Sequence, residues 1–526
     1  MPSPALSVPF LAAVALSLAS PAVRAGSAPP AARCTIPASG DWREYQTRHF
    51  VLTTDASRRR AAALARQLEE LHAIVVGSLF DGAVDIPGRV QVVAFASPHE
   101  LERFAPPRRS GFAFSAPGER WIVFADEGRE APGPAVAHAL THAIAWHRFP
   151  RQPLWFREGL AQFMETAGQV RTVPAFPEMG SLLVRGDRWS GGRFAGFASP
   201  ELLDRAPSSR AVTAKDLLEG RGRADDGDPG PLHAASWLLY HWLSNERAKQ
   251  LTAYEDRLAK GEDPAAAWRA VFPELDPASG EGAARLDREL AGYRHDGRYL
   301  TFRVRPGKYD ASFVDRAVPT AELHLILAAI RGASRWPQDD AERAALLRAE
   351  RDEALREDPL LPGAVAARAR EDGASVPDAL APVIAARPND ARGWSLLAGA
   401  LDPAVYPQEK EAALRKAAAL APDDAHANAA LAAFLAGSGR AREARPLADH
   451  ALDLAPGDPE IVETLAAVAF GIGQCKPAVE LERRAAELFP ADDAAGAAAR
   501  ARLAEYAARC AGAGAAAPGP VTASIR

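Results

Sequence analysis

The sequence has few cysteines and no long apolar stretch. Among its 526 residues there are 3 cysteines and 3 methionines. Three cysteines are too few for a fold held together by disulfide bonds. No segment after the N-terminal region approaches 18 consecutive apolar residues, so the sequence predicts no transmembrane helix.

The sequence also lacks a large excess of either charge. Its 62 basic and 67 acidic residues give a formal net charge of -5. This balance provides no global attraction to nucleic acid or to anionic lipid, and we expect neither partner. The length predicts roughly two to four domains. The hydrophobic fraction of 48% and the charged fraction of 25% are typical of globular proteins.

The three cysteines leave two interpretations open. Cys475 and Cys510 both lie in the helical C-terminal region and can pair in an oxidising compartment, which leaves Cys34 free in a flexible segment. Alternatively, Cys475 and Cys510 are buried, unpaired thiols, because free cysteine is often buried.

The N-terminal region is typical of a secretory signal. A short apolar run from about Val8 to Ala19 precedes the small-residue pattern Val23-Arg24-Ala25. We expect residues 1–25 to be a signal peptide, residues 26–45 to be a spacer, and the mature protein to be periplasmic or secreted. The arginine directly before Cys34 disfavours lipid attachment at that cysteine.

Residues 46–305 have the pattern of an α+β domain. Runs rich in β-branched and aromatic residues predict strands at His49–Thr54, Val90–Ser97 and Trp121–Asp126. A segment with helical apolar spacing separates the first two strands. Residues 136–166 should form two helices, since the prolines of the intervening "RFPRQP" prevent one continuous helix.

Two histidines and a glutamate in these two helices have the spacing of a metal site. His138 and His142 are four positions apart, so a helix presents both imidazoles on one face. Glu158, on the second helix, can complete a three-ligand set for zinc with a fourth position open.

The second helix also contains Trp155, Glu158, Gly159 and Ala161 in the pattern W-x-x-E-G-x-A. With the histidine pair, this pattern resembles the gluzincin-like (peptidase MA-like) metallopeptidases over roughly His49 to Tyr299. The resemblance implies a zincin-like α+β domain in which His138, His142 and Glu158 are the zinc ligands.

One residue departs from the pattern of that family. The family motif is H-E-x-x-H, whereas this chain has "HALTH", with Ala139 at the position of the proton-transferring glutamate. General acid–base catalysis of this kind contributes about 10²- to 10⁴-fold in rate. The resemblance therefore implies a pseudo-peptidase, and it leaves zinc occupancy open.

Other polar residues near the motif have a possible functional role and a simpler structural one. Glu165, Asp126, Glu127 and Glu130 are candidates to replace the missing base, although acidic residues are usually solvated. His147 is expected to cap its helix or to face solvent. His233, Tyr240 and His241 lie in a segment that often supplies an oxyanion-stabilising group in gluzincins, but core packing is the simpler explanation of this aromatic segment.

The second half of the chain contains a regular repeat. Pro388, Pro422, Pro456 and Pro490 recur at one constant interval, which equals the period of about 34 residues of the tetratricopeptide repeat (TPR). The repeat resembles that family, which implies an all-α solenoid that binds a protein or peptide. The expected helix-packing positions are Trp394, Leu397, Ala398, Leu414, Ala417, Leu431, Ala432, Ala444, Ala451, Leu465, Ala466, Ala478 and Ala485.

These patterns predict degenerate helical repeats or a connector at 306–387, TPR repeats with a capping helix at 388–510, and a disordered tail at 511–526. Three functions remain open. The first is an exported pseudo-peptidase whose repeats serve recognition or scaffolding. The second is an active zinc peptidase with an unconventional base, and the third is a helical-repeat protein with an inert N-terminal remnant.

Overall fold

The structure is a computed structural model. It describes residues 41–80, 84–107, 109–116, 119–129, 132–168, 170–174, 189–196, 212–220, 230–296, 299–489 and 494–513. The expected signal peptide, most of the expected spacer, Cys34, Glu130 and residues 514–526 of the expected tail lie outside the described residues.

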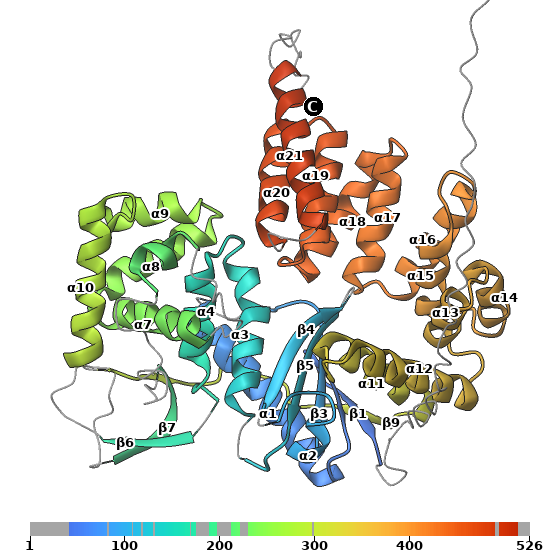
Figure 1. Ribbon diagram of the computed structural model, residues 1–526, viewed down its shortest axis with the longest axis horizontal. Helices are drawn as coiled ribbons and strands as arrows, with labels where there is room; N and C mark the ends of the chain where they lie inside the picture. Colours follow the sequence, from blue (N-terminus) through green and yellow to red (C-terminus); the bar gives the residue numbers. More distant parts are fainter. Residues whose placement is uncertain are drawn as a thin grey trace, which may run out of the picture.

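A mixed sheet forms the centre of the N-terminal region (Figure 1). Its order is β4-β5-β3-β2-β1-β9. Strands β2, β3 and β5 run parallel, and β4, β1 and β9 each run antiparallel to the neighbouring strand. The strands are β1 (Arg43–Gln46), β2 (Phe50–Thr54), β3 (Val90–Phe95), β4 (Gly111–Ala116), β5 (Glu119–Ala125) and β9 (Val314–Ala317).

Each face of this sheet is covered by helices, so successive strand residues enter two separate cores. In β3, Val92 and Ala94 join the core that includes residues of α1 (Arg58–Leu79) and α3 (Pro134–Arg148). Val93 and Phe95 join the core on the other face, with α2 (Pro98–Leu101) and α11 (Thr320–Ser334). This alternation follows from the two-residue period of a strand.

The α/β unit continues past residue 305, where the sequence predicts a connector. β9 pairs with β1 in the register Arg43↔Ala317, and the Val318 amide donates a 2.9 Å hydrogen bond to the Trp42 carbonyl. Helix α11 then buries Leu327 and Ile330 against the sheet. The beginning of the expected connector, 306–334, therefore includes an edge strand and a covering helix. Their partners lie near the start of the α/β unit, beyond the reach of a local pattern.

The second half of this region is mainly helical. Its helices surround a long central helix, α7, and a second sheet with the order β6-β7-β8 lies beside them (Figure 1). The elements are α4 (Leu154–Met164), β6 (Val170–Pro174), β7 (Trp189–Ala195), α6 (Ala214–Leu218), α7 (Gly230–Glu246), α8 (Ala248–Ala259), α9 (Pro264–Val271), the 3-10 helix η1 (Pro273–Leu275), α10 (Gly280–Asp296) and β8 (Phe302–Val304). As predicted, residues 136–166 form two helices, separated by Pro150 and Pro153.

The C-terminal part is a stack of helical hairpins, which confirms the predicted all-α repeat region. The helices that end repeats, α14, α16, α18 and α20, end at Ala386, Leu420, Leu454 and Leu488. Each end lies one full repeat period after the previous one. The helices are α12 (Asp340–Glu357), α13 (Pro362–Glu371), α14 (Val376–Ala386), α15 (Ala391–Ala400), α16 (Pro407–Leu420), α17 (Ala425–Gly437), α18 (Ala441–Leu454), α19 (Pro459–Gly471), α20 (Cys475–Leu488) and α21 (Ala494–Ala513).

The repeats share a start signal as well as an end signal. Asp390, Asp424 and Asp458 precede α15, α17 and α19, and each carboxylate accepts hydrogen bonds from two backbone amides of the helix that follows. Such N-caps satisfy amides that have no partner within the helix. The proline that ends one repeat and the aspartate two positions later thus define the turn between hairpins.

The predicted packing positions form the interior of the stack. All are buried except Trp394 and Leu397, which are partly buried against the same core. The predicted capping helix is α21, whose Tyr506 ring stacks on Phe470 with ring centroids 4.2 Å apart. A disulfide bond joins Cys475 at the start of α20 to Cys510 in α21, which decides between the two interpretations of these cysteines.

The solenoid bends back onto the loop between α3 and α4. Arg151 in that loop is 8% exposed and binds Glu487 of α20 at 2.8 Å and Asp263 at 3.0 Å. Next to it, Trp146 packs so closely on Gly457 that a side chain at Gly457 would lie 2.6 Å from the indole ring. The two regions therefore meet next to the helices that carry the candidate metal ligands.

None of the described helices is both long enough and apolar enough to cross a membrane.

Candidate metal centre

Helices α3 and α4 bring His138, His142 and Glu158 together. The Nε2 atoms of the two histidines are 3.0 Å apart. The Oε2 atom of Glu158 lies 3.3 Å from His142 Nε2 and 3.6 Å from His138 Nε2. The three residues whose convergence the sequence predicts thus direct one ligand atom each toward a common point.

These separations fit a zinc ion. Zinc binds histidine nitrogen and carboxylate oxygen at about 2.0–2.2 Å, so ligand atoms at the corners of a tetrahedron lie about 3.3–3.6 Å apart. The three observed distances, 3.0, 3.3 and 3.6 Å, are close to that range. His138, His142 and Glu158 would hold the ion with little rearrangement.

Glu165 supports this set from outside. Its Oε1 atom accepts a 2.9 Å hydrogen bond from Nδ1 of His138. A carboxylate on the far nitrogen of a ligating histidine fixes the tautomer and the ring orientation, and it makes the ring a stronger ligand. The sequence singles out Glu165 as a replacement base, but the structure places its carboxylate on the outer nitrogen of His138.

The two carboxylates of the cluster stabilise a positive charge on His138. Burial alone would lower the pKa of His138, but its hydrogen bonds to Glu158 and Glu165 raise that pKa to about 9. Burial would raise the pKa of Glu158, but its contacts with the two histidines lower it overall. Burial lowers the pKa of His142, whose neutral Nε2 can accept a hydrogen bond from His138. At neutral pH the His138 ring is therefore protonated and lies between the carboxylates of Glu158 and Glu165.

The remaining residues of the W-x-x-E-G-x-A pattern fix the position of Glu158. A Cβ atom at Gly159 would lie 2.5 Å from the Ser236 carbonyl oxygen and 2.8 Å from Tyr240 Cβ, so only glycine allows α4 to approach α7 this closely. Trp155 is 1% exposed, and its ring stacks on Tyr254 with centroids 5.8 Å apart. Ala161 is fully buried. In this pattern, tryptophan, glycine and alanine pack α4 against its neighbours, and Glu158 is the polar side chain that faces the histidines.

No described acid takes the place of the missing glutamate at Ala139, which belongs to the buried core. Asp126 accepts two 2.6 Å hydrogen bonds from Arg60, and Glu127 forms an ion pair with Arg129. Both carboxylates are thus engaged away from the histidines. Among the described residues, the acids that contact His138 or His142 are Glu158 and Glu165.

The three candidate oxyanion residues on α7 have different positions. His233 reaches the cluster, with its Nε2 atom 3.5 Å from Glu158 Oε2. His241 is fully buried and makes 2.8 Å contacts with the Tyr293 hydroxyl and the Gly196 carbonyl. The Tyr240 hydroxyl donates a 3.1 Å hydrogen bond to Glu255. His241 and Tyr240 therefore have structural partners, and His233 alone of the three faces the cluster.

His147 lies in the last turn of α3 and is partly exposed. It lines a cavity between the sheet region and the solenoid, where burial lowers its pKa to about 4. The sequence places it correctly off the ligand face but does not show that a distant part of the chain covers it.

Comparison with known proteins yields structural likenesses only. No protein-family model matches the sequence, and no curated protein matches it either. TTC0263, a thermophilic TPR protein of Thermus thermophilus, is 21% identical to this chain. The match covers 36% of this chain and 97% of the TTC0263 chain, with a TM-score of 0.27. Yeast Tom70 is 12% identical, covers 59% of this chain and 70% of its own, and has a TM-score of 0.28.

A third likeness is to MamA of Desulfovibrio magneticus RS-1, which is 17% identical, covers 36% of this chain and 97% of its own, and has a TM-score of 0.21. With values this low, the repeat assignment rests on the constant period of the chain itself and on its helical hairpins.

Proposed function

We propose that this chain is an exported pseudo-peptidase of gluzincin type that uses its helical repeats for recognition or scaffolding of other proteins. The observation that carries the proposal is the convergence of His138, His142 and Glu158 beside an alanine. The ligand set is complete in the described structure, whereas the position expected to move protons carries a methyl group.

Zinc is the metal that this set of two imidazoles and one carboxylate would hold. When bound, such an ion polarises a carbonyl group that approaches it. His138, His142 and Glu158 would bind the ion, and Glu165 would orient His138. His233, next to Glu158, is placed to donate a hydrogen bond to a carbonyl group held near the ion.

The absence of a base at position 139 argues for binding rather than hydrolysis. A methyl group neither accepts a proton from water nor returns one to a leaving amine, a contribution worth about 10²- to 10⁴-fold in rate. Glu165 shares a proton with His138 on the side away from the shared ligand point, so its carboxylate supports the ligand and does not replace the base.

The solenoid supports a protein-binding role. Stacked helical hairpins offer an extended surface on which a peptide or a protein segment can lie. Tyr406 and Val405, between α15 and α16, are 49% and 61% exposed and are available for contact with a partner. We propose a protein or peptide as the partner.

The Cys475–Cys510 disulfide supports the proposed export. Disulfide bonds persist in the periplasm and outside the cell, and they are rare in the reducing cytosol. The predicted signal peptide agrees with this, so we propose a periplasmic or secreted location.

The experiment compares the purified wild type with Ala139→Glu on a mixed peptide library. We expect no chelator-sensitive cleavage by the wild type and measurable cleavage by Ala139→Glu. Ala139→Gln is the matched control, because it adds a side chain of the same size without a base. Chelator-sensitive cleavage by the wild type would refute the proposal.

The same experiment separates the two other functions. Cleavage by the wild type that disappears in His233→Ala would favour an active peptidase, because His233 Nε2 lies 3.5 Å from Glu158 Oε2 and is placed next to a bound substrate. Wild-type protein with no metal after dialysis against zinc would favour an inert remnant.

A further inference from the structure

A second cluster of metal-ligand side chains lies on the opposite side of α3. His49 precedes β2, and Glu69 and His72 lie three positions apart on α1, where a helix presents both on one face. One ligand atom from each of the three residues lies within 4.8 Å of the other two. No sequence motif marks this group, since β2 and α1 bring it together only in the folded chain.

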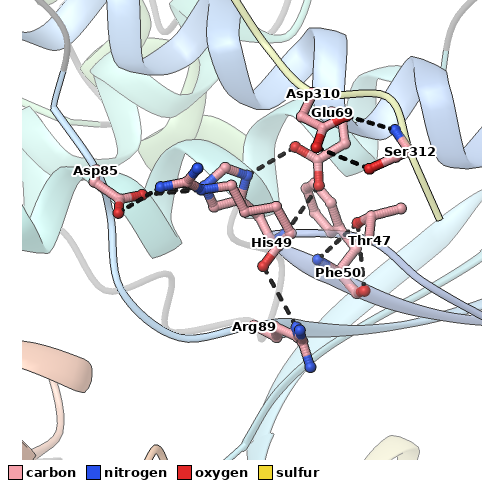
Figure 2. Close-up of polar contacts among 9 residues, drawn as sticks. Thr47, His49, Phe50, Glu69, Asp85, Arg89, Asp310 and Ser312 are labelled. Carbon is pink, nitrogen blue, oxygen red and sulfur yellow. Dashed lines mark hydrogen bonds and ion pairs between the residues drawn. The ribbon is translucent and has the colours of Figure 1, made fainter. Parts of the chain in front are cut away.

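Glu69 supplies a buried negative charge. It is 1% exposed, and its carboxylate accepts hydrogen bonds from the backbone amide of His49 at 2.9 Å and from His49 Nδ1 at 2.7 Å. Burial would raise the pKa of Glu69, but the hydrogen bonds from His49 and Thr47 lower it. Figure 2 shows His49 between Glu69 and Asp85, and His49 Nε2 lies 3.7 Å from the Asp85 carboxylate.

His72 is the unsatisfied member of the cluster. It is 6% exposed, and among the described residues its imidazole has ring contacts but no hydrogen-bond partner. Because His72 also lines a neighbouring cavity, its ring is accessible to an ion or a ligand.

A cavity of about 160 Å³ adjoins these side chains. Its lining includes His49 and His72 on one side and Gly457 and Asp458 of the solenoid on the other. Leu140, Ala143, Ile144 and His147 of α3 complete one wall. At about 100° per residue these four lie on the opposite face of α3 from His138 and His142. The cavity is therefore separate from the first cluster and large enough for an ion with bound water.

We propose that His49, Glu69 and His72 form a second metal site, specific for a divalent transition metal such as zinc. Two imidazoles and one carboxylate suit zinc, whereas calcium and magnesium prefer all-oxygen sites. The ion takes the place of the proton between His49 and Glu69. It also gives His72 the partner that it lacks, after the His72 ring turns out of its 3.8 Å stack on His49.

The test removes the first cluster and then asks for a remaining ion. Full-length His138→Ala/His142→Ala protein is dialysed against zinc, and its metal content is measured by elemental analysis. We expect about one zinc per chain to remain, because the second set is intact. Adding His72→Gln should remove that zinc, and adding the isosteric Glu69→Gln should weaken its binding strongly. Adding His99→Gln is the matched control, since His99 has an 87% exposed side chain, and it should change nothing.

Two results would overturn the second site. One is a His138→Ala/His142→Ala protein without zinc, and the other is retention of its zinc after His72→Gln. Unfolding curves in chelator show whether each variant is folded, and His49→Gln replaces any variant that is not. A wild type whose zinc is unaffected by His142→Ala but lost in His72→Gln would refute the first site while supporting the second.

Discussion

The two donor clusters that flank α3 contain the same residue types but differ in what holds them. In the first cluster, the ligand atoms are 3.0 to 3.6 Å apart and Glu165 fixes the His138 ring. In the second, His49 and Glu69 bond directly to each other at 2.7 Å and the two imidazoles stack. Because affinity depends on preorganisation, we expect the first cluster to bind zinc more tightly. The two clusters thus differ in their outer partners rather than in their residue types.

The largest expected effect is the loss of the tighter ion. His142→Ala removes a direct ligand of the first cluster and leaves the second intact. Competition with a chromophoric chelator should then show only the more weakly bound zinc ion. The number of zinc ions bound per chain should fall from about two to about one. His241→Gln, on the same domain but away from both clusters, should leave both classes unchanged. Tight binding that survives His142→Ala would reverse the ranking.

The close helix contact behind the first cluster should be the next most sensitive feature. Gly159→Ala places a methyl group against the Ser236 carbonyl and Tyr240, so α4 must move away from α7. We expect the free energy of unfolding to fall by about 1–3 kcal/mol, measured by urea denaturation. Tight zinc binding should weaken as well, because Glu158 moves with the helix.

Gly292→Ala is the matched control for this substitution. Gly292 lies inside α10, and a Cβ atom there would have no neighbour within 4 Å. Alanine should stabilise the protein by about 0.5–1 kcal/mol at this position. Similar destabilisation by both substitutions would show that the α4–α7 approach is not the cause.

A smaller change should follow from removing the outer carboxylate of the first cluster. Glu165→Gln keeps the size of the side chain but removes the charge next to His138 Nδ1. We expect the affinity of the tight zinc class to fall by about 10- to 100-fold, as measured by chelator competition, with the weaker class unchanged. An unchanged tight class would show that Glu165 does not prepare the site.

A separate effect concerns the pH dependence of folding. Burial lowers the pKa of His241 to about 4, from an ordinary value of 6.5. The unfolded chain therefore takes up a proton between pH 6.5 and about 4 that the folded chain does not. The free energy of unfolding therefore has its full value above pH 6.5. It decreases as the pH falls through this window, by up to about 1.4 kcal/mol per pH unit.

Urea denaturation at pH 7 and pH 5 measures this loss. His241→Gln should reduce the difference between the two pH values, because glutamine does not titrate. His450→Gln, at an exposed position of α18, serves as the control and should retain the wild-type difference. An equal difference in all three proteins would exclude His241 as the cause.

Much of the architecture can be predicted from local periodicity. The helical break at Pro150 and Pro153, the three strands β2, β3 and β5 and the regular helical repeat all appear in the structure where the sequence indicates them. The burial of Ala432, Ala466 and Ala478 follows from the same repeat. These features depend on neighbours a few positions apart, or on a spacing that recurs, so a linear pattern contains them.

Long-range pairing is the part of the fold that the pattern misses. β9 joins the sheet through partners in β1, and α11 covers the same sheet although its sequence looks like a further repeat helix. The apolar face of a helix shows that it is buried but not against which element. The predicted boundary at residue 305 therefore falls inside the α/β unit.

The ligands of the first cluster can be specified from local sequence. The four-residue spacing of His138 and His142 and the pattern around Glu158 identify three candidate ligand side chains, and Ala139 occupies the position where the family motif has its base. Helix geometry makes these statements nearly independent of the rest of the fold.

The surroundings of those ligands depend on how the whole chain is packed. The folded chain places His233 at the cluster and Tyr240 and His241 elsewhere, it turns Glu165 from a candidate base into a support for His138, and it assembles His49, Glu69 and His72 without a motif. The physical reason is that these roles arise where helices and strands distant in sequence pack against one another. A three- or four-residue period contains no information about that packing.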